Sequence, residues 1–293
     1  MSLYSHPKMT DEVHPLLETK LKQLLQKHLH DNPIWQGDFM KAIEVWPDDL
    51  KKWDLENTWA EQMTAASKAF RGYVLHTMAE AEPDVQFILG KNWMEEAGFE
   101  ESIDDPTTGK WHYPKMMHTA MIDRLVVKVG ATHYGHKHDN PQFLSTTTDH
   151  VETHLRVCAN RFENMSRKLG MVYLIESLTA SEFGRIGKGF ANTWPKVHDR
   201  VKAKLGAAVT APRDYFAPGK NGSFYFENNS EADDGVRDAE GNLIKRGHNI
   251  LMALAFQAQL LADGVNLDNE AELDQALVPF EDGMAISINR RER

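Results

Sequence analysis

Helical periodicity runs through most of this 293-residue chain and constrains its fold more than any other feature. In residues 11–29 the apolar side chains recur at intervals of three and four, as they do on one face of an amphipathic helix. Similar patterns, or runs of strong helix-forming residues, predict further helices at 35–46, 47–79, 84–98, 116–129, 149–170, 171–194 and 248–263. Such a chain buries its apolar stripes by packing helix against helix, so we expect an all-α bundle.

Two segments depart from the helical pattern. Residues 101–115 and 234–247 each place a polar, glycine-containing turn between short and more extended flanks, which is typical of a β-hairpin. Nothing in the composition marks a domain boundary. We therefore expect one helical domain over residues 1–293, with two short hairpin-like insertions and a C-terminal tail over about 266–293.

Local signals also predict where one central helix begins and ends. The four residues from Asp149 to Glu152 have the acidic spacing of a capping box, which indicates a helix start. Gly170 follows at a distance that suits the end of the same helix.

Composition narrows the classes of partner and metal. The chain has 33 Lys and Arg against 43 Asp and Glu, a formal net charge of −10, whereas nucleic acids and anionic membranes favour basic proteins. The single cysteine, Cys158, excludes an intramolecular disulfide framework and a cysteine-based zinc or iron–sulfur site. A metal would therefore need nitrogen and oxygen ligands from the 14 His and the carboxylates, which suits iron, manganese or zinc.

The sequence also carries a prediction about location. It shows no basic-then-apolar signal pattern at its start and no apolar stretch long enough to span a bilayer. We expect a soluble, cytoplasmic protein that binds neither membrane nor nucleic acid.

One predicted helix carries adjacent acidic residues and is followed by a histidine. Residues 92–98 have the sequence NWMEEAG, in which Glu96 is the fourth residue after Asn92. His118 follows, twelve residues before Gly130.

Two later stretches also place acidic residues in unusual surroundings. Residues 169–177 (LGMVYLIES) are apolar apart from Glu176, and an ionised carboxylate is costly to bury there without a partner. A cation is the simplest partner, and an ion pair with Arg or Lys elsewhere is the alternative. Residues 225–233 (YFENNSEAD) begin with two aromatic residues and end at Asp233.

Together these stretches resemble the metal-binding motifs of the heme-oxygenase-like diiron oxidases and oxygenases, relatives of the TenA and PqqC proteins. The resemblance implies a bundle of about seven helices around a central cavity, usually in a homodimer. It implies one or two non-heme iron ions rather than heme, dioxygen as co-substrate, an external electron donor, and a small organic substrate such as an amino acid, a fatty acid or a cofactor precursor. The metal ligands that it implies are Glu96, His118, Glu176, Asp233 and His248.

The chain departs from the family pattern in its last motif. Asn229 stands where the family has the first His of His-x-x-x-Asp-x-x-His, and Val236 stands where it has the second. His248 can supply the last ligand only if the 234–247 insertion loops out and returns the helix to register. Because an amide is a poorer ligand than imidazole, a mononuclear or weakly loaded site is an alternative to a diiron centre.

Two other functions remain open at this level. One is a metal-free TenA- or PqqC-like enzyme; TenA-like hydrolysis would use a cysteine nucleophile, for which Cys158 on an amphipathic helix is a poor candidate. The other is a non-catalytic protein that binds a small ligand and pairs its acidic residues internally. His150 and His154, one helical turn apart, have a spacing that can bind metal, but nothing nearby in the sequence completes a site.

Overall fold

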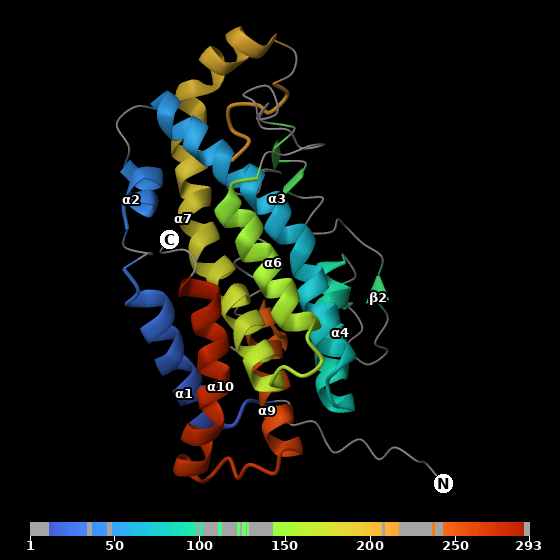
Figure 1. The fold of residues 1–293 in the computed structure, drawn as a ribbon. Helices are drawn as coiled ribbons and strands as arrows, with labels where there is room; N and C mark the ends of the chain where they lie inside the picture. Colours follow the sequence, from blue (N-terminus) through green and yellow to red (C-terminus); the bar gives the residue numbers. More distant parts are fainter. Residues whose placement is uncertain are drawn as a thin grey trace.

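The structure is a computed structural model, and it describes a large part of the chain. The described residues are 12–33, 37–45, 49–97, 100–101, 111–112, 122–123, 125–126, 128, 143–206, 209–216, 236–237 and 243–289. Within them the protein is an all-α bundle that carries two short β-hairpins, so the predicted fold class is confirmed (Figure 1).

Long helices form the body of the bundle, and Figure 1 shows α3, α6 and α7 running side by side. In chain order the helices are α1 (Pro15–Leu25), the π-helix η1 (Gln26–His30), α2 (Asp38–Val45), α3 (Asp49–Ala79), α4 (Pro83–Glu96), α6 (Ser145–Ala159), α7 (Met165–Leu205), α9 (His248–Ala262) and α10 (Glu270–Asn289). The described residues within the predicted helix 116–129 are helical as well.

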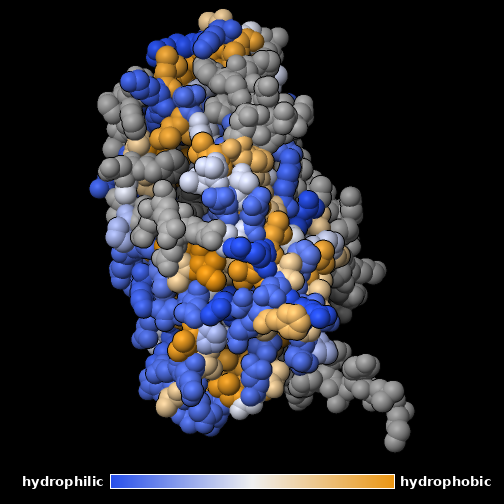
Figure 2. All heavy atoms as spheres, in the orientation of Figure 1, coloured by the Kyte–Doolittle hydropathy of each residue, from blue (hydrophilic) through white to orange (hydrophobic). Residues whose placement is uncertain are grey.

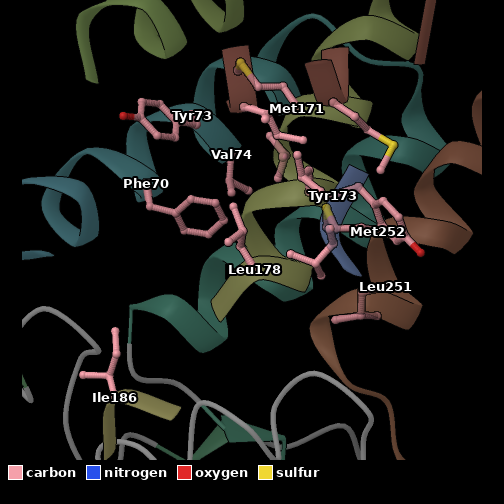
Figure 3. Close-up of a cluster of buried hydrophobic side chains, with 14 of the residues drawn as sticks. Phe70, Tyr73, Val74, Met171, Tyr173, Leu178, Ile186, Leu251 and Met252 are labelled. Carbon is pink, nitrogen blue, oxygen red and sulfur yellow. The ribbon is translucent and has the colours of Figure 1, made fainter. Parts of the chain in front are cut away.

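Helix α9 is the most buried of the helices near the site. Its side chains are apolar around most of the circumference, and a helix of that kind is stable only when other helices surround it. It packs against α4 and α7. In Figure 3 its residue Met252 lies beside Tyr173 of α7, and both belong to the buried apolar core. Because α9 lies inside the bundle, its first residue, His248, is buried too.

The helix predicted over 149–170 was wrong at both ends. Asp149 lies inside α6, which begins at Ser145 and ends at Ala159. A short connection follows, and α7 begins at Met165. Its N-cap is Asn164, whose side-chain oxygen accepts a hydrogen bond from the Arg167 amide (3.2 Å). An Asn in this position satisfies one of the free amides of the first turn, and it is the start signal that the capping-box prediction overlooked.

Gly170 is not a helix end but the point where α7 touches α10. A Cβ at Gly170 would overlap the backbone carbonyl of Phe280, and a Cβ at Gly283 would overlap the carbonyl of Arg167. The two helices therefore approach each other backbone to backbone, each through its own glycine. Such an approach is possible only where neither residue has a side chain.

Helix α10 is an integral part of the bundle, although the sequence suggested a tail over 266–293. It buries its apolar face against the rest of the core, through Leu273, Leu277, Phe280, Met284 and Ile288. The Phe280 ring stacks on Phe256 of α9, with ring centroids 4.0 Å apart.

The second hairpin lies within the predicted insertion 234–247, and the first begins at Glu100, one residue before the predicted insertion 101–115. Strand β1 (Glu100–Glu101) pairs antiparallel with β2 (Trp111–His112), and Glu100 is opposite His112. Strand β3 (Val236–Arg237) pairs antiparallel with β4 (Leu243–Lys245), with an irregularity in register between its two residues. The first hairpin begins four residues after the end of α4, and the second ends three residues before the start of α9. Both hairpins thus adjoin the region where those two helices meet.

The molecular surface is largely polar on the face shown in Figure 2, where apolar residues are interspersed among hydrophilic ones. The large apolar side chains that are exposed come from several elements: Leu75, Phe87, Phe143, Leu144, Phe162, Leu261 and Val278. Among the described helices, none combines the length and the apolar character that a membrane-spanning segment needs.

The close contact between α7 and α10 leads to a stability prediction. Gly170→Ala should destabilise the protein by about 1–3 kcal/mol or more, because the added methyl group forces the two backbones apart. Equilibrium unfolding in urea measures the change.

Gly184→Ala is the matched control in the same helix. A Cβ at Gly184 meets nothing within 4 Å, so alanine should stabilise α7 there by about 0.5–1 kcal/mol through its higher helix propensity. Equal effects of the two substitutions would contradict the backbone contact.

Candidate metal centre

The last turns of α4 present three polar side chains on one buried face. Asn92, Glu95 and Glu96 occupy positions i, i+3 and i+4, which lie above one another on a helix. All three are buried, and Asn92 is fully so. The helix therefore brings two carboxylates and an amide into the interior of the bundle.

Two other helices complete the cluster. Glu176 lies in α7 and is 3% exposed, and His248 is the first residue of α9 and is 2% exposed. The His248 Nδ1 atom lies 3.3 Å from Glu176 Oε2 and 3.5 Å from Glu96 Oε1. One ligand atom from each of these three residues lies within 4.8 Å of the other two. Three buried nitrogen and oxygen donors thus converge from three helices.

The same residues make further hydrogen bonds inside the cluster. Asn92 Nδ2 donates to Glu176 Oε1 (2.7 Å), and His248 Nε2 donates to Glu95 Oε2 (2.9 Å). Asn92 Oδ1 is buried and accepts no hydrogen bond from any residue that the structure describes. It is a polar atom at the site that a metal-bound water or a ligand could satisfy.

The charge of His248 follows from its surroundings. Burial by itself lowers the pKa of this imidazole, but the charge of Glu176 and the hydrogen bonds to Glu176 and Glu95 outweigh it. The pKa of His248 is therefore raised well above its ordinary value. A cation bound at Nδ1 would take the place of a proton on that nitrogen.

The donor set suits a metal ion in its chemistry, and its two distances from His248 Nδ1 suit one as well. Two ligands bound to one ion at about 2 Å lie at most about 4 Å apart, and both distances from His248 Nδ1 are inside that limit. Carboxylate oxygen and imidazole nitrogen suit iron, manganese and zinc. The carboxylates of Glu96 and Glu176 belong to the group that could hold the ion, and the carboxylate of Glu95 contacts the other nitrogen of the imidazole.

The structure brings together three of the five ligands that the sequence suggested: Glu96, Glu176 and His248. The other two, His118 and Asp233, lie outside the described residues, as does Asn229. His248 is the first residue of α9 and follows the β3–β4 hairpin by three residues. That these three residues bind a metal stays a prediction.

Asn92 and Glu95 are the members of the cluster whose contacts sequence analysis missed. Their spacing from Glu96 was visible and places all three on one face of a helix. The residues that they contact come from α7 and α9, far along the chain, and no spacing rule within α4 predicts those partners.

His154, which the sequence pairs with His150, has a structural role. His154 is fully buried, and its Nδ1 donates to the His150 carbonyl (2.6 Å). Its Nε2 lies 2.9 Å from the Ser287 hydroxyl. The Nδ1 bond stays within α6, and the Nε2 contact joins α6 to α10. Among the described residues, the cluster of Glu96, Glu176 and His248 is the one group of three His, Cys, Asp or Glu residues with metal-binding geometry.

Cys158 does not have the properties of a nucleophile. It lies fully buried in α6. Burial raises the pKa of its thiol to about 11. The thiolate, which is the reactive form, is therefore scarce at neutral pH.

No known protein family matches this chain, and no curated protein or solved structure matches it either. The chemistry of the buried cluster is therefore what the functional conclusion depends on.

The surroundings of Cys158 predict slow reaction with thiol reagents. At pH 8 a thiol with a pKa of about 11 is ionised to about one part in a thousand. The native protein should therefore react with a disulfide reagent far more slowly than the same protein unfolded in guanidinium. Labelling of the native protein at the rate of the unfolded chain would show that Cys158 is accessible and reactive.

Proposed function

We propose that this protein is a non-heme iron oxidase or oxygenase of the heme-oxygenase-like kind, which uses dioxygen and an external electron donor to oxidise a small organic molecule. The observation that carries the proposal is the convergence of Glu96, Glu176 and His248 in the interior of the helical bundle. The family motifs in the sequence support the same assignment, since these three residues are among the ligands that the motifs imply.

Iron is the metal that we favour because of what the donors can do. Carboxylates can bind a metal through one oxygen or two, and imidazole is a neutral ligand that holds the metal firmly. Because the protein supplies few ligands, coordination positions would stay open for other molecules. A bound iron supplies the activation of dioxygen, which organic substrates need because they react slowly with it unaided. His118 and Asp233 are the residues that we propose as additional ligands, and a second iron would depend on them.

The residues around the cluster would keep bulk water away from the reaction. On α7, the neighbours Val172, Leu174 and Leu178 of Glu176 are buried, and α9 continues from His248 into the apolar core. Exclusion of water strengthens the electrostatic interactions in a site and limits side reactions of reactive intermediates.

The two alternatives differ in their need for a metal. A metal-free hydrolase with a cysteine nucleophile is disfavoured by the burial and the raised thiol pKa of Cys158. A non-catalytic binding protein would use the acidic cluster only as internal ion pairs, so its ligand affinity would not depend on iron.

Iron content separates these possibilities. We expect protein from iron-supplemented cells, or after anaerobic reconstitution with Fe²⁺, to retain at least about one equivalent of iron after desalting. Elemental analysis makes the measurement. Iron below about a tenth of an equivalent after reconstitution would exclude the proposed function.

Replacement of one ligand tests which residues hold the metal. Glu176→Gln keeps the shape of the side chain and an acceptor for Asn92 but removes the anionic ligand, so iron affinity should fall by about 100-fold or more. Wild-type protein should gain about 2.7 kcal/mol in free energy of unfolding at Fe²⁺ concentrations near 100 times Kd, and the variant should gain almost nothing. Anaerobic melting with and without Fe²⁺ measures this difference.

Glu152→Gln is the matched control. It removes one acidic charge from an exposed position in α6, so it should bind Fe²⁺ as the wild type does. If Glu176→Gln and the control bind Fe²⁺ equally, Glu176 is not a ligand.

A further inference from the structure

The carboxylates of two consecutive residues of α4 meet opposite sides of one imidazole ring. Glu96 Oε1 lies 3.5 Å from His248 Nδ1, whereas Glu95 Oε2 lies 2.9 Å from His248 Nε2. All three side chains are buried. The two glutamates therefore have different relations to the ring and cannot serve it in the same way.

This geometry determines which nitrogen of the imidazole would bind a metal. A neutral histidine has one protonated nitrogen and one with a free lone pair, and a metal binds the second. Both ring nitrogens of His248 face carboxylates, which only accept hydrogen bonds: Nε2 faces Glu95 Oε2, and Nδ1 faces Glu176 Oε2 and Glu96 Oε1. A cation held by Glu96 and Glu176 would lie on the Nδ1 side of the ring and take the place of the proton there, whereas the proton on Nε2 would stay with Glu95.

We infer that His248 binds the metal through Nδ1 and that Glu95 is the positioning residue that fixes this choice. Its carboxylate does so by accepting a hydrogen bond from the N–H group at Nε2. The inference rests on the proposed metal site and adds the orientation of its imidazole ligand. A carboxylate that holds the second nitrogen of a metal-binding histidine fixes its tautomer and makes it a stronger ligand.

Asn92 orients Glu176, the ligand from α7, much as Glu95 orients His248. Its Nδ2 donates to Glu176 Oε1 (2.7 Å), which leaves Oε2 directed at His248 Nδ1 (3.3 Å). One face of α4 thus supplies one ligand, Glu96, and the two groups that orient the ligands from α7 and α9. The Asn-x-x-Glu-Glu spacing acquires a physical meaning from these contacts.

The tautomer of His248 in the metal-loaded protein is the direct test. Zn²⁺ is a suitable diamagnetic probe, and histidine labelled with ¹⁵N reports which ring nitrogen carries hydrogen; the His248→Gln spectrum identifies the signals. We expect the Zn²⁺-loaded wild type to show hydrogen on Nε2 of His248 and metal on Nδ1. A signal from hydrogen on Nδ1 would overturn the inference.

Variants at Glu95 provide a second measurement. Glu95→Leu removes the acceptor and should weaken Zn²⁺ and Fe²⁺ binding about 10- to 100-fold. Glu95→Gln keeps an oxygen that can accept from Nε2 and should weaken binding by less than about tenfold. Glu82→Gln, which removes an exposed charge at the N-cap of α4, should leave affinity unchanged.

These outcomes separate the inference from the proposed function. If wild-type protein binds neither Zn²⁺ nor Fe²⁺, the proposed metal site itself is wrong. If the wild type binds both ions and Glu95→Leu binds them equally well, the metal site stands and the role of Glu95 is wrong. Circular dichroism shows whether each variant is folded, and if Glu95→Leu is not, the tautomer in the wild type decides the question.

Discussion

The backbone contact between α7 and α10 at Gly170 and Gly283 is the constraint on which the buried cluster depends. Glu176 lies six residues beyond Gly170, less than two helical turns away, so the helix that carries its carboxylate is fixed against α10 close to the cluster. Phe280, whose carbonyl faces Gly170, also stacks on Phe256 of α9. Two of the three donor residues, Glu176 and His248, are therefore carried by helices that pack against the same element.

Much of the architecture could be predicted because the elements depend on local sequence patterns. Periodicity indicated the helices, and glycine-containing polar turns indicated both hairpins. Gly170 shows where such reasoning stops, because a glycine in a helical pattern can end a helix or admit another backbone. The choice depends on α10, more than a hundred residues away. The sequence predicts a tail after residue 265 for a similar reason, since the helices that α10 packs against lie elsewhere in the chain.

In the candidate site, too, the sequence predicts some features and not others. Glu96 and Glu176 can be selected from the sequence because their residue types and surroundings resemble a known pattern, whereas His248 departs from the spacing of that pattern and qualifies only on the condition that the 234–247 insertion loops out. The relation between Glu95 and His248 could not be predicted, because it depends on the orientation of one ring between two helices. Sequence motifs indicate which groups are available for chemistry. The packing of α4 against α9 decides which atom of each group faces the others.

The positions of the three donors along the chain have a consequence for folding. About 80 residues separate Glu96 from Glu176, and 72 separate Glu176 from His248. An ion held by all three would act as a cross-link that closes two long loops of chain at one point. Loop closure costs more entropy as the loop lengthens, so such a link would restrict the unfolded chain severely. Loss of the ion would then loosen three helices together.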